Sequence, residues 1–278
     1  MAEKKPNQLI VTDELPGCVA AAVSAAASKA ISARGSFCIA IAGGSLVKML
    51  GAMADTPGID WTKWHVAWVD ERCVPLADGE SNYGGALAAW LSKVPIPPAQ
   101  IYTLVDREAG GGLAAAQKHA DEYEAKLRAV AALPQENGLP VFDLLLLGFG
   151  PDGHVCSLFP SHPLLSDASG RWVLPIGDSP KPPPERVTLS LAAVNAARAV
   201  ALVGSGSGKA MPVGHALGAE AGGDAPSLPC ALARGAGPTP PLWLLDEAAA
   251  APLGPEHRAT FGAPAGGHSA FDFAAHFA

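Results

Sequence analysis

Short apolar runs recur along the chain and alternate with longer helical patterns. The runs predict buried or half-buried strands over 36–42, 64–69, 101–104, 144–148, 172–175, 186–190, 199–203 and 242–245. Between them the pattern predicts helices over 16–32, 46–54, 83–91, 113–133, 191–197 and 210–217. Continuous apolar strands bounded by glycine and proline are typical of parallel sheets buried on both faces. We therefore expect one Rossmann-like α/β domain over residues 1–250, with an open, mostly parallel sheet and helices on both faces.

The stretch Leu144 to Pro163 is the most informative part of this pattern. Four leucines run into Gly148, Gly150 and Gly153, so the chain must turn sharply where the strand ends. Ligands of open parallel sheets bind beyond the carboxyl ends of the strands, which is where Asp152 and His154 are expected. The alternative is a tight strand-to-helix turn whose histidine is only exposed.

Three other strand ends carry candidate chemistry. Gly43-Gly44-Ser45 lies between a strand and a helix, a layout that suits an anion, although many glycine-rich turns bind nothing. Lys209 follows a glycine-rich turn at a helix start and suits a phosphate oxygen, but its spacing is not that of a P-loop. Asp70-Glu71-Arg72 follows a strand, either as part of a site or as a salt-bridged loop. Ser81 or Asn82 is expected to cap the next helix.

Other polar residues favour structural roles. The charges of the helix over 113–133 predict a solvated face, and we assign His119 to that surface. The Gly/Ala/Pro-rich segment 251–278 is predicted to be a C-terminal extension, and its histidines match no standard metal motif. Five scattered cysteines without a CxxC pair fit reduced thiols better than a disulfide framework or a zinc site.

Composition narrows the class of partner. The chain is 49% hydrophobic and 16% charged, with a mean hydropathy of +0.21, which indicates a globular protein. A net charge of −7 argues against nucleic acid or an anionic membrane as the main partner, although local cations can still bind an anionic metabolite. We find neither a secretory signal nor a run of 18 apolar residues, so a cytoplasmic protein is expected.

Taken in order, the motifs resemble those of the 6-phosphogluconolactonase family, within the wider glucosamine/galactosamine-6-phosphate isomerase superfamily. The resemblance covers about residues 8 to 250. Its strongest part is Gly148-Phe149-Gly150-Pro151-Asp152-Gly153-His154 followed by Ser157-Leu158-Phe159-Pro160. The other matching segments are Gly43-Gly44-Ser45, Asp70-Glu71-Arg72 with Val74-Pro75, Glu80-Ser81-Asn82-Tyr83-Gly84, Arg186-Val187-Thr188-Leu189, Asn195-Ala196-Ala197-Arg198, Lys209-Ala210, Leu228-Pro229 and Leu245-Asp246-Glu247-Ala248-Ala249.

The resemblance implies hydrolysis of 6-phosphoglucono-1,5-lactone to 6-phosphogluconate, the second step of the oxidative pentose phosphate pathway. In that reaction His154 is expected to be the general base and Asp152 to orient it or the sugar hydroxyls. The implied substrate-binding residues are Gly44, Ser45, Asp70, Arg72, Arg186 and Lys209. Neither a cofactor nor a metal is required, because a δ-lactone is an activated ester. The expected partner is the phosphorylated sugar lactone alone, and we expect a monomer.

Two differences from related motifs affect the expected phosphate contacts and the choice between the alternative activities. The family has threonine and proline where this chain has Leu46-Val47, which removes one hydroxyl donor near the expected phosphate. Glucosamine-6-phosphate isomerase/deaminases have a glutamate that assists ring opening where this chain has Phe159, which cannot transfer a proton. A non-catalytic sugar-phosphate sensor is a third possibility, but such proteins usually carry a DNA-binding segment that this acidic chain lacks.

Overall fold

The computed structural model describes residues 6–218, 228–262 and 267–278. Its main sheet has six parallel strands in the order β1-β11-β10-β7-β2-β3. In chain order these are β1 (Gln8–Val11), β2 (Phe37–Ile41), β3 (Trp64–Trp68), β7 (Leu144–Gly148), β10 (Val200–Gly204) and β11 (Leu242–Leu245). The four inner strands β11, β10, β7 and β2 are almost wholly buried, as their uninterrupted apolar sequences predict.

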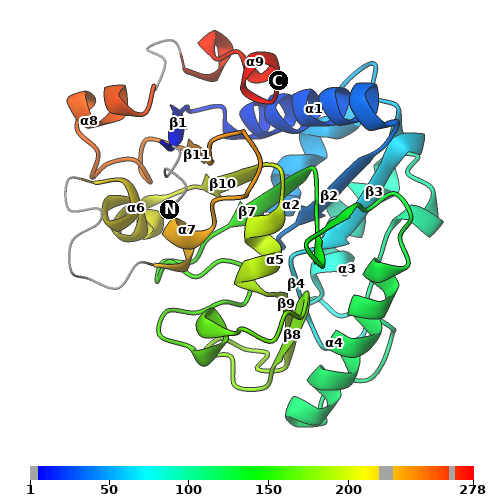
Figure 1. Cartoon of the computed structure of the whole chain (residues 1–278). Helices are drawn as coiled ribbons and strands as arrows, with labels where there is room; N and C mark the ends of the chain where they lie inside the picture. The colour runs from blue at the N-terminus through cyan, green and yellow to red at the C-terminus, as the bar shows by residue number, and fades with distance from the viewer. Residues whose placement is uncertain (1–5, 219–227, 263–266) are drawn as a thin grey trace.

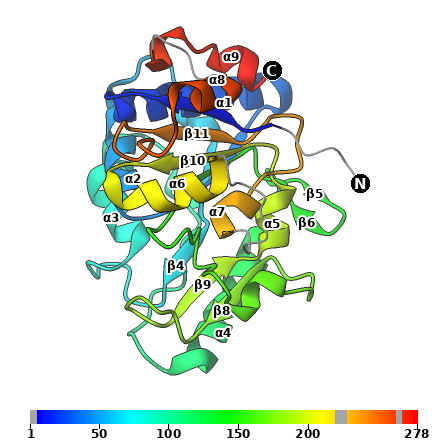
Figure 2. The same ribbon diagram turned by 90° about the vertical axis from the view of Figure 1, so that its left-hand side faces the viewer.

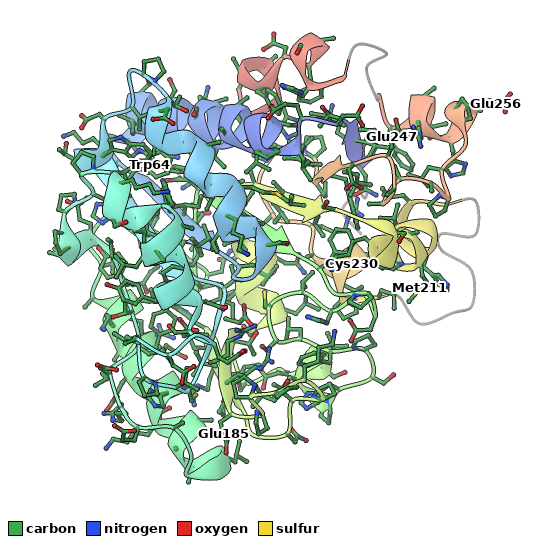
Figure 3. All side chains as sticks on the ribbon, turned by 180° about the vertical axis from the view of Figure 1, so that it is seen from behind. Trp64, Glu185, Met211, Cys230, Glu247 and Glu256 are labelled. Atoms are coloured by element: carbon green, nitrogen blue, oxygen red, sulfur yellow. The ribbon has the colours of Figure 1, made fainter. Side chains whose placement is uncertain are left out.

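Helices lie on both sides of this sheet, which confirms the predicted fold class. Helices α2 and α3 lie on one side, and α5 and α7 lie on the other (Figures 1 and 3). The helices are α1 (Leu15–Arg34), α2 (Ser45–Leu50), α3 (Asn82–Ala89), α4 (Gly112–Arg128), α5 (Leu191–Ala196), α6 (Ala210–Leu217), α7 (Pro229–Leu232), α8 (Pro255–Thr260) and α9 (Phe273–His276). As predicted, Ser81 caps α3, where its side chain accepts a hydrogen bond from the Gly84 N–H.

Helix α1 is the only helix of the described residues that is long and apolar enough to cross a membrane by length and hydropathy alone. Half of its most apolar window is buried inside the fold, where the alanine and valine side chains pack against β11, β2 and α2. Small side chains allow this close approach of helix and sheet. We therefore interpret α1 as a core helix.

A second, three-stranded antiparallel sheet was not predicted. It contains β4 (Asp70–Arg72), β9 (Arg186–Leu189) and β8 (Val173–Ile176) in the order β4-β9-β8, and α4 packs against it. Figure 2 shows this sheet below the six-stranded one, and in Figure 3 Glu185, just before β9, lies far from Trp64 at the start of β3. The interpretation of Asp70-Glu71-Arg72 as a loop was therefore wrong, because these residues pair with β9 across the chain.

Three further expectations differ from the structure. His119 is buried, not on the surface, because it lies one helical turn before Tyr123, which is buried and accepts a hydrogen bond from the backbone N–H of Trp68 in β3. That helix ends at Arg128, and the chain then continues through turns into a short hairpin of β5 (Gln135–Glu136) and β6 (Leu139–Pro140). The predicted strand over 101–104 is reduced to a single bridge between Ile101 and Val66.

The C-terminal segment packs on the domain at the level of α1. Phe273 and Phe277 are buried, and α9 lies against α1 (Figure 1). His276 forms a hydrogen bond with Gln8, and His268 forms one with Thr12 at 3.0 Å. These side chains thus join the end of the chain to its beginning.

Candidate active site

A cavity of about 270 Å³ opens at the carboxyl ends of β2, β7 and β10. It lies where the topology of a parallel sheet predicts a ligand site. Of the residues predicted for the site, seven line the cavity: Gly44, Ser45, Asp70, Arg72, His154, Arg186 and Lys209. The eighth, Asp152, contacts His154. The structure therefore brings together residues from five separate stretches of the chain.

The turn after β7 positions His154. The Gly150 N–H donates to the His154 carbonyl at 2.9 Å, and the Gly153 N–H donates to the Gly150 carbonyl at 3.0 Å. Gly153 has a φ of 82°, which favours glycine. Gly150 is needed for a different reason, because a Cβ there would lie 2.2 Å from ring atoms of His154. The glycines of the motif thus let the histidine fold back over the turn.

His154 and Asp152 form a hydrogen-bonded pair. The distance between His154 Nδ1 and Asp152 Oδ1 is 2.6 Å, and the side chains are 16% and 37% exposed. Burial alone would raise the pKa of Asp152, but His154 and Lys181 outweigh it and the pKa is lowered. An ionised carboxylate only accepts hydrogen bonds, so Nδ1 carries the proton and Nε2 has a free lone pair.

The imidazole itself is held neutral. Burial lowers the pKa of His154, and the attraction of Asp152 offsets this only in part. The Phe159 ring packs beside the imidazole, with 4.6 Å between ring centroids. A neutral, oriented histidine at the mouth of a polar cavity is suited to general-base catalysis.

Lys181 is a site residue that sequence reasoning missed. Its Nζ lies 3.3 Å from Asp152 Oδ1 and 3.3 Å from His154 Nδ1, and the side chain lines the cavity. The sequence shows it only as a lysine inside the proline-rich segment SPKPPPE between two strands. The only signal in the sequence is one positive charge on a proline-rich loop, and no local pattern indicates which strand end that loop approaches.

Arg186 lines the cavity as predicted, and it also holds this loop. Its guanidinium donates from Nε to the Pro183 carbonyl and from Nη2 to the Lys181 and Pro182 carbonyls, each at 2.9 Å. The remaining nitrogen, Nη1, lies 3.4 Å from Ser157 Oγ. Most of its donors are therefore engaged by the protein.

Asp70 forms part of the cavity floor. It is only 6% exposed, and its Oδ2 accepts a hydrogen bond from Ser157 Oγ at 2.8 Å. Cys156 lies beside it, and full burial raises the pKa of this thiol well above its ordinary value. A thiol so difficult to ionise is a packing residue and not a nucleophile.

The opposite wall comes from the glycine turn after β2 and from β4. Gly44 has a φ of 72°, and a Cβ at Gly43 would lie 1.8 Å from Asn82 Oδ1. Asn82 donates from Nδ2 to the Asp70 carbonyl at 2.8 Å, which ties this wall to the floor. Arg72 donates from Nη1 to the Glu80 carbonyl at 2.6 Å, while its Nε has no partner among the described residues.

Glu71, which sequence reasoning left without a role, anchors this wall. Its buried carboxylate accepts hydrogen bonds from the backbone N–H groups of Arg72, Asn82 and Tyr83 at 2.7 to 2.8 Å. Burial raises its pKa to about 7 although these donors oppose the change. The carboxylate therefore fixes the start of α3 to β4.

Lys209 supplies a cation on the far side of the cavity. Its Nζ lies 5.8 Å from the centroid of the Phe149 ring. Partial burial lowers its pKa, and the positive charge of Lys181 acts in the same direction. Within the ranges that the structure describes, no three His, Cys, Asp or Glu side chains form a metal-binding group.

The sequence and the fold of this chain are similar to those of known proteins. Residues 11–240 match the profile of the family described as glucosamine-6-phosphate isomerases/6-phosphogluconolactonase. A protein of Oryza sativa subsp. indica named probable 6-phosphogluconolactonase 4, chloroplastic, is 46% identical over 198 residues, which cover 68% of this chain but only 59% of the relative. Another protein of the same rice, named probable 6-phosphogluconolactonase 2, is 37% identical over 272 residues, which cover 93% of this chain and 94% of the relative.

The fold is also similar to solved structures. The 6-phosphogluconolactonase from Trypanosoma brucei superimposes with a TM-score of 0.76 at 27% identity, over 91% of this chain and all of that one. The superposition therefore spans about nine tenths of this chain.

Proposed function

Because this chain belongs to the glucosamine-6-phosphate isomerase/6-phosphogluconolactonase family, we propose that it hydrolyses 6-phosphoglucono-1,5-lactone to 6-phosphogluconate. The observation that carries the proposal is the His154–Asp152 pair at the mouth of a cavity lined with cations. Ester hydrolysis at neutral pH needs a base that can deprotonate water, and a negatively charged phosphate needs positive groups. The cavity supplies both within one space.

The proposed reaction begins with a water molecule beside His154 Nε2. The imidazole takes a proton from the water as its oxygen attacks the lactone carbonyl, and the carbonyl oxygen becomes an oxyanion. The tetrahedral intermediate collapses with cleavage of the bond between carbonyl carbon and ring oxygen. The imidazolium then returns its proton to the departing ring oxygen, and the new carboxylic acid ionises in water. Asp152 holds the tautomer that leaves Nε2 free throughout.

The cations have separate proposed tasks. We expect the phosphate to lie against Ser45 and the turn at Gly44, with Lys209 as a charged partner. Arg72, whose Nε has no partner among the described residues, is available for the phosphate or the developing oxyanion. Arg186 is expected to contribute mainly through the loop that it holds, since its donors face backbone carbonyls.

An isomerase or deaminase acting on glucosamine-6-phosphate is the second candidate, since the family contains both activities. Phe159 argues against it. This side chain is buried to 2% exposure and packs on the His154 ring, at the position where the resemblance expects the glutamate of a deaminase. A phenyl ring at that place cannot transfer a proton to a sugar ring.

The test is a coupled assay in which glucose-6-phosphate dehydrogenase generates the lactone. Formation of the acid is followed above spontaneous hydrolysis with wild type, His154→Ala and the matched control His215→Ala, an exposed histidine of α6. We expect His154→Ala to lose roughly a hundredfold or more in kcat and the control to keep wild-type activity. An active His154→Ala variant, or release of ammonia from glucosamine-6-phosphate by the wild type, would contradict the proposal.

We further propose that the protein acts as a cytoplasmic monomer. Its five cysteines are all free and buried, which supports a reducing compartment, and the negative charge disfavours nucleic acid and membrane partners. Light scattering should give a mass near 28.2 kDa, and cell fractionation should recover the protein with cytoplasmic markers. A dimer mass or recovery with an organelle would contradict the respective part.

A further inference from the structure

We propose that Lys181 is a positioning residue of this site, which shares the Asp152 carboxylate with His154 and thereby keeps the imidazole neutral and ready to act as a base. The inference rests on the proposed lactonase function. It concerns a residue that the sequence motifs did not indicate. Three observations support it: the contacts of the ammonium group, the anchoring of its loop, and the charges around the histidine.

The ammonium group contacts both members of the pair. Lys181 Nζ lies 3.3 Å from Asp152 Oδ1, the same oxygen that accepts the His154 Nδ1 proton. It also lies 3.3 Å from His154 Nδ1. One carboxylate oxygen is therefore shared by two donors, and the imidazole ring has a positive charge beside its protonated nitrogen.

The backbone of Lys181 is held firmly enough to keep this arrangement. Its carbonyl accepts hydrogen bonds from Ser179 Oγ at 2.8 Å and from Arg186 Nη2 at 2.9 Å. Its N–H donates to Ser179 Oγ at 3.2 Å. Arg186 also binds the carbonyls of Pro182 and Pro183, so one buried guanidinium fixes three consecutive residues. A loop anchored in this way delivers its side chain at low entropic cost.

The charges around His154 determine how Lys181 affects its protonation. Asp152 and, at greater distance, Asp70 favour the imidazolium form of His154, whereas Lys181 disfavours it. The other titratable or charged groups lining the same cavity are Arg72, Cys156, Arg186 and Lys209. Since Lys181 neutralises part of the charge on Asp152, the carboxylate can orient the imidazole without trapping it as a cation. Lys181 itself neither gains nor loses a proton in this role.

The discriminating experiment compares Lys181→Met with Lys181→Arg, and uses Lys93→Met as a matched control for the loss of one positive charge. Lys93 is exposed and lies outside the cavity. For each protein, kcat/KM is measured from pH 5 to 8 after subtraction of spontaneous hydrolysis. In parallel, NMR follows the titration of His154, assigned with the His154→Ala variant.

We expect Lys181→Met to move the acid limb of kcat/KM, and the NMR titration of His154, upward by about one pH unit. On the acid limb, at pH values well below the pKa of His154, the activity at a given pH should then fall about tenfold, while the plateau at higher pH stays within about threefold of wild type. Lys181→Arg, which keeps the positive charge, should show little of this shift, and Lys93→Met should show none. An unmoved acid limb with a raised KM would overturn the proposal and make Lys181 a phosphate ligand instead.

The two proposals fail in different ways. If the wild type shows no lactonase activity, the proposed function fails, but the NMR titration still tests the effect of Lys181 on His154. If the wild type is active and the His154 titration is the same in Lys181→Met, only the role of Lys181 is wrong.

Discussion

The substitution Gly150→Ala tests whether the position of the imidazole, and not only its presence, determines activity. An added Cβ would lie 2.2 Å from His154 Nδ1 and Cε1 and 2.4 Å from Asp152 Oδ1, whereas ordinary contacts begin at 3.4 Å. The ring must therefore retreat by roughly 1 Å, a misplacement that can cost about a hundredfold in rate. We expect kcat to fall by about that factor.

The same change should do little to the fold. The φ of Gly150 is not positive, so alanine is compatible with its backbone, and His154 lies partly open to the cavity and can move. Overpacking at such a site is expected to cost about 1 kcal/mol, a fall in Tm of about 3 °C.

The assay measures kcat/KM and Tm for Gly150→Ala beside Gly254→Ala, a glycine whose added Cβ meets nothing within 4 Å and whose φ is −64°. The control should match the wild type in both quantities. If Gly150→Ala keeps activity within about threefold, the close packing of His154 over the turn has no catalytic importance. If it instead unfolds, the glycine serves stability.

Three other changes give separate predictions. Asp152→Asn should lower kcat roughly a hundredfold in steady-state assays, because an amide can donate to His154 Nδ1 and favour the wrong tautomer; a wild-type kcat would contradict this. The pKa of Glu71 is raised from 4.5 to about 7, so its stabilising contribution is full below pH 4.5 and lost as pH rises through 7. In urea unfolding at several pH values, the unfolding free energy of Glu71→Gln should fall less between pH 4.5 and about 7 than that of the wild type. Equal falls in the two proteins would refute this prediction. Asp143→Ala removes the buried partner of Arg34 and of the Cys38 N–H, and should cost about 2 kcal/mol of unfolding free energy without a change in kcat.

The local sequence was sufficient wherever one segment determines its own structure. The run Leu144–Gly148 is apolar at every position before its glycine, which predicts a strand with both of its faces buried. The glycines that follow force the turn that carries His154, and Ser81 caps the helix that begins after it. These features depend on hydrophobic burial, backbone sterics and capping, all of which act over a few residues.

Sequence reasoning failed where a structure depends on a distant partner. Asp70-Glu71-Arg72 is too short and too polar to indicate a strand, and it becomes one only because β9 supplies its hydrogen bonds. His119 lies in a polar stretch of α4, yet it shares a helix face with Tyr123, which is buried and hydrogen-bonded to Trp68 of β3, and it is itself buried. No local pattern contains the position of those partners.

By itself, therefore, the local sequence determined the parallel α/β class and the turn after β7 that carries Asp152 and His154, whereas the set of substrate-binding residues came from the family resemblance. The family resemblance added the expected chemistry. Only the tertiary structure decided that Arg186 binds three carbonyls of a proline-rich loop and that Lys181 shares a carboxylate with His154. The physical reason is that hydrogen bonds and charges act over a few ångströms in space, and residues 152 and 181 become neighbours only when the two sheets pack together.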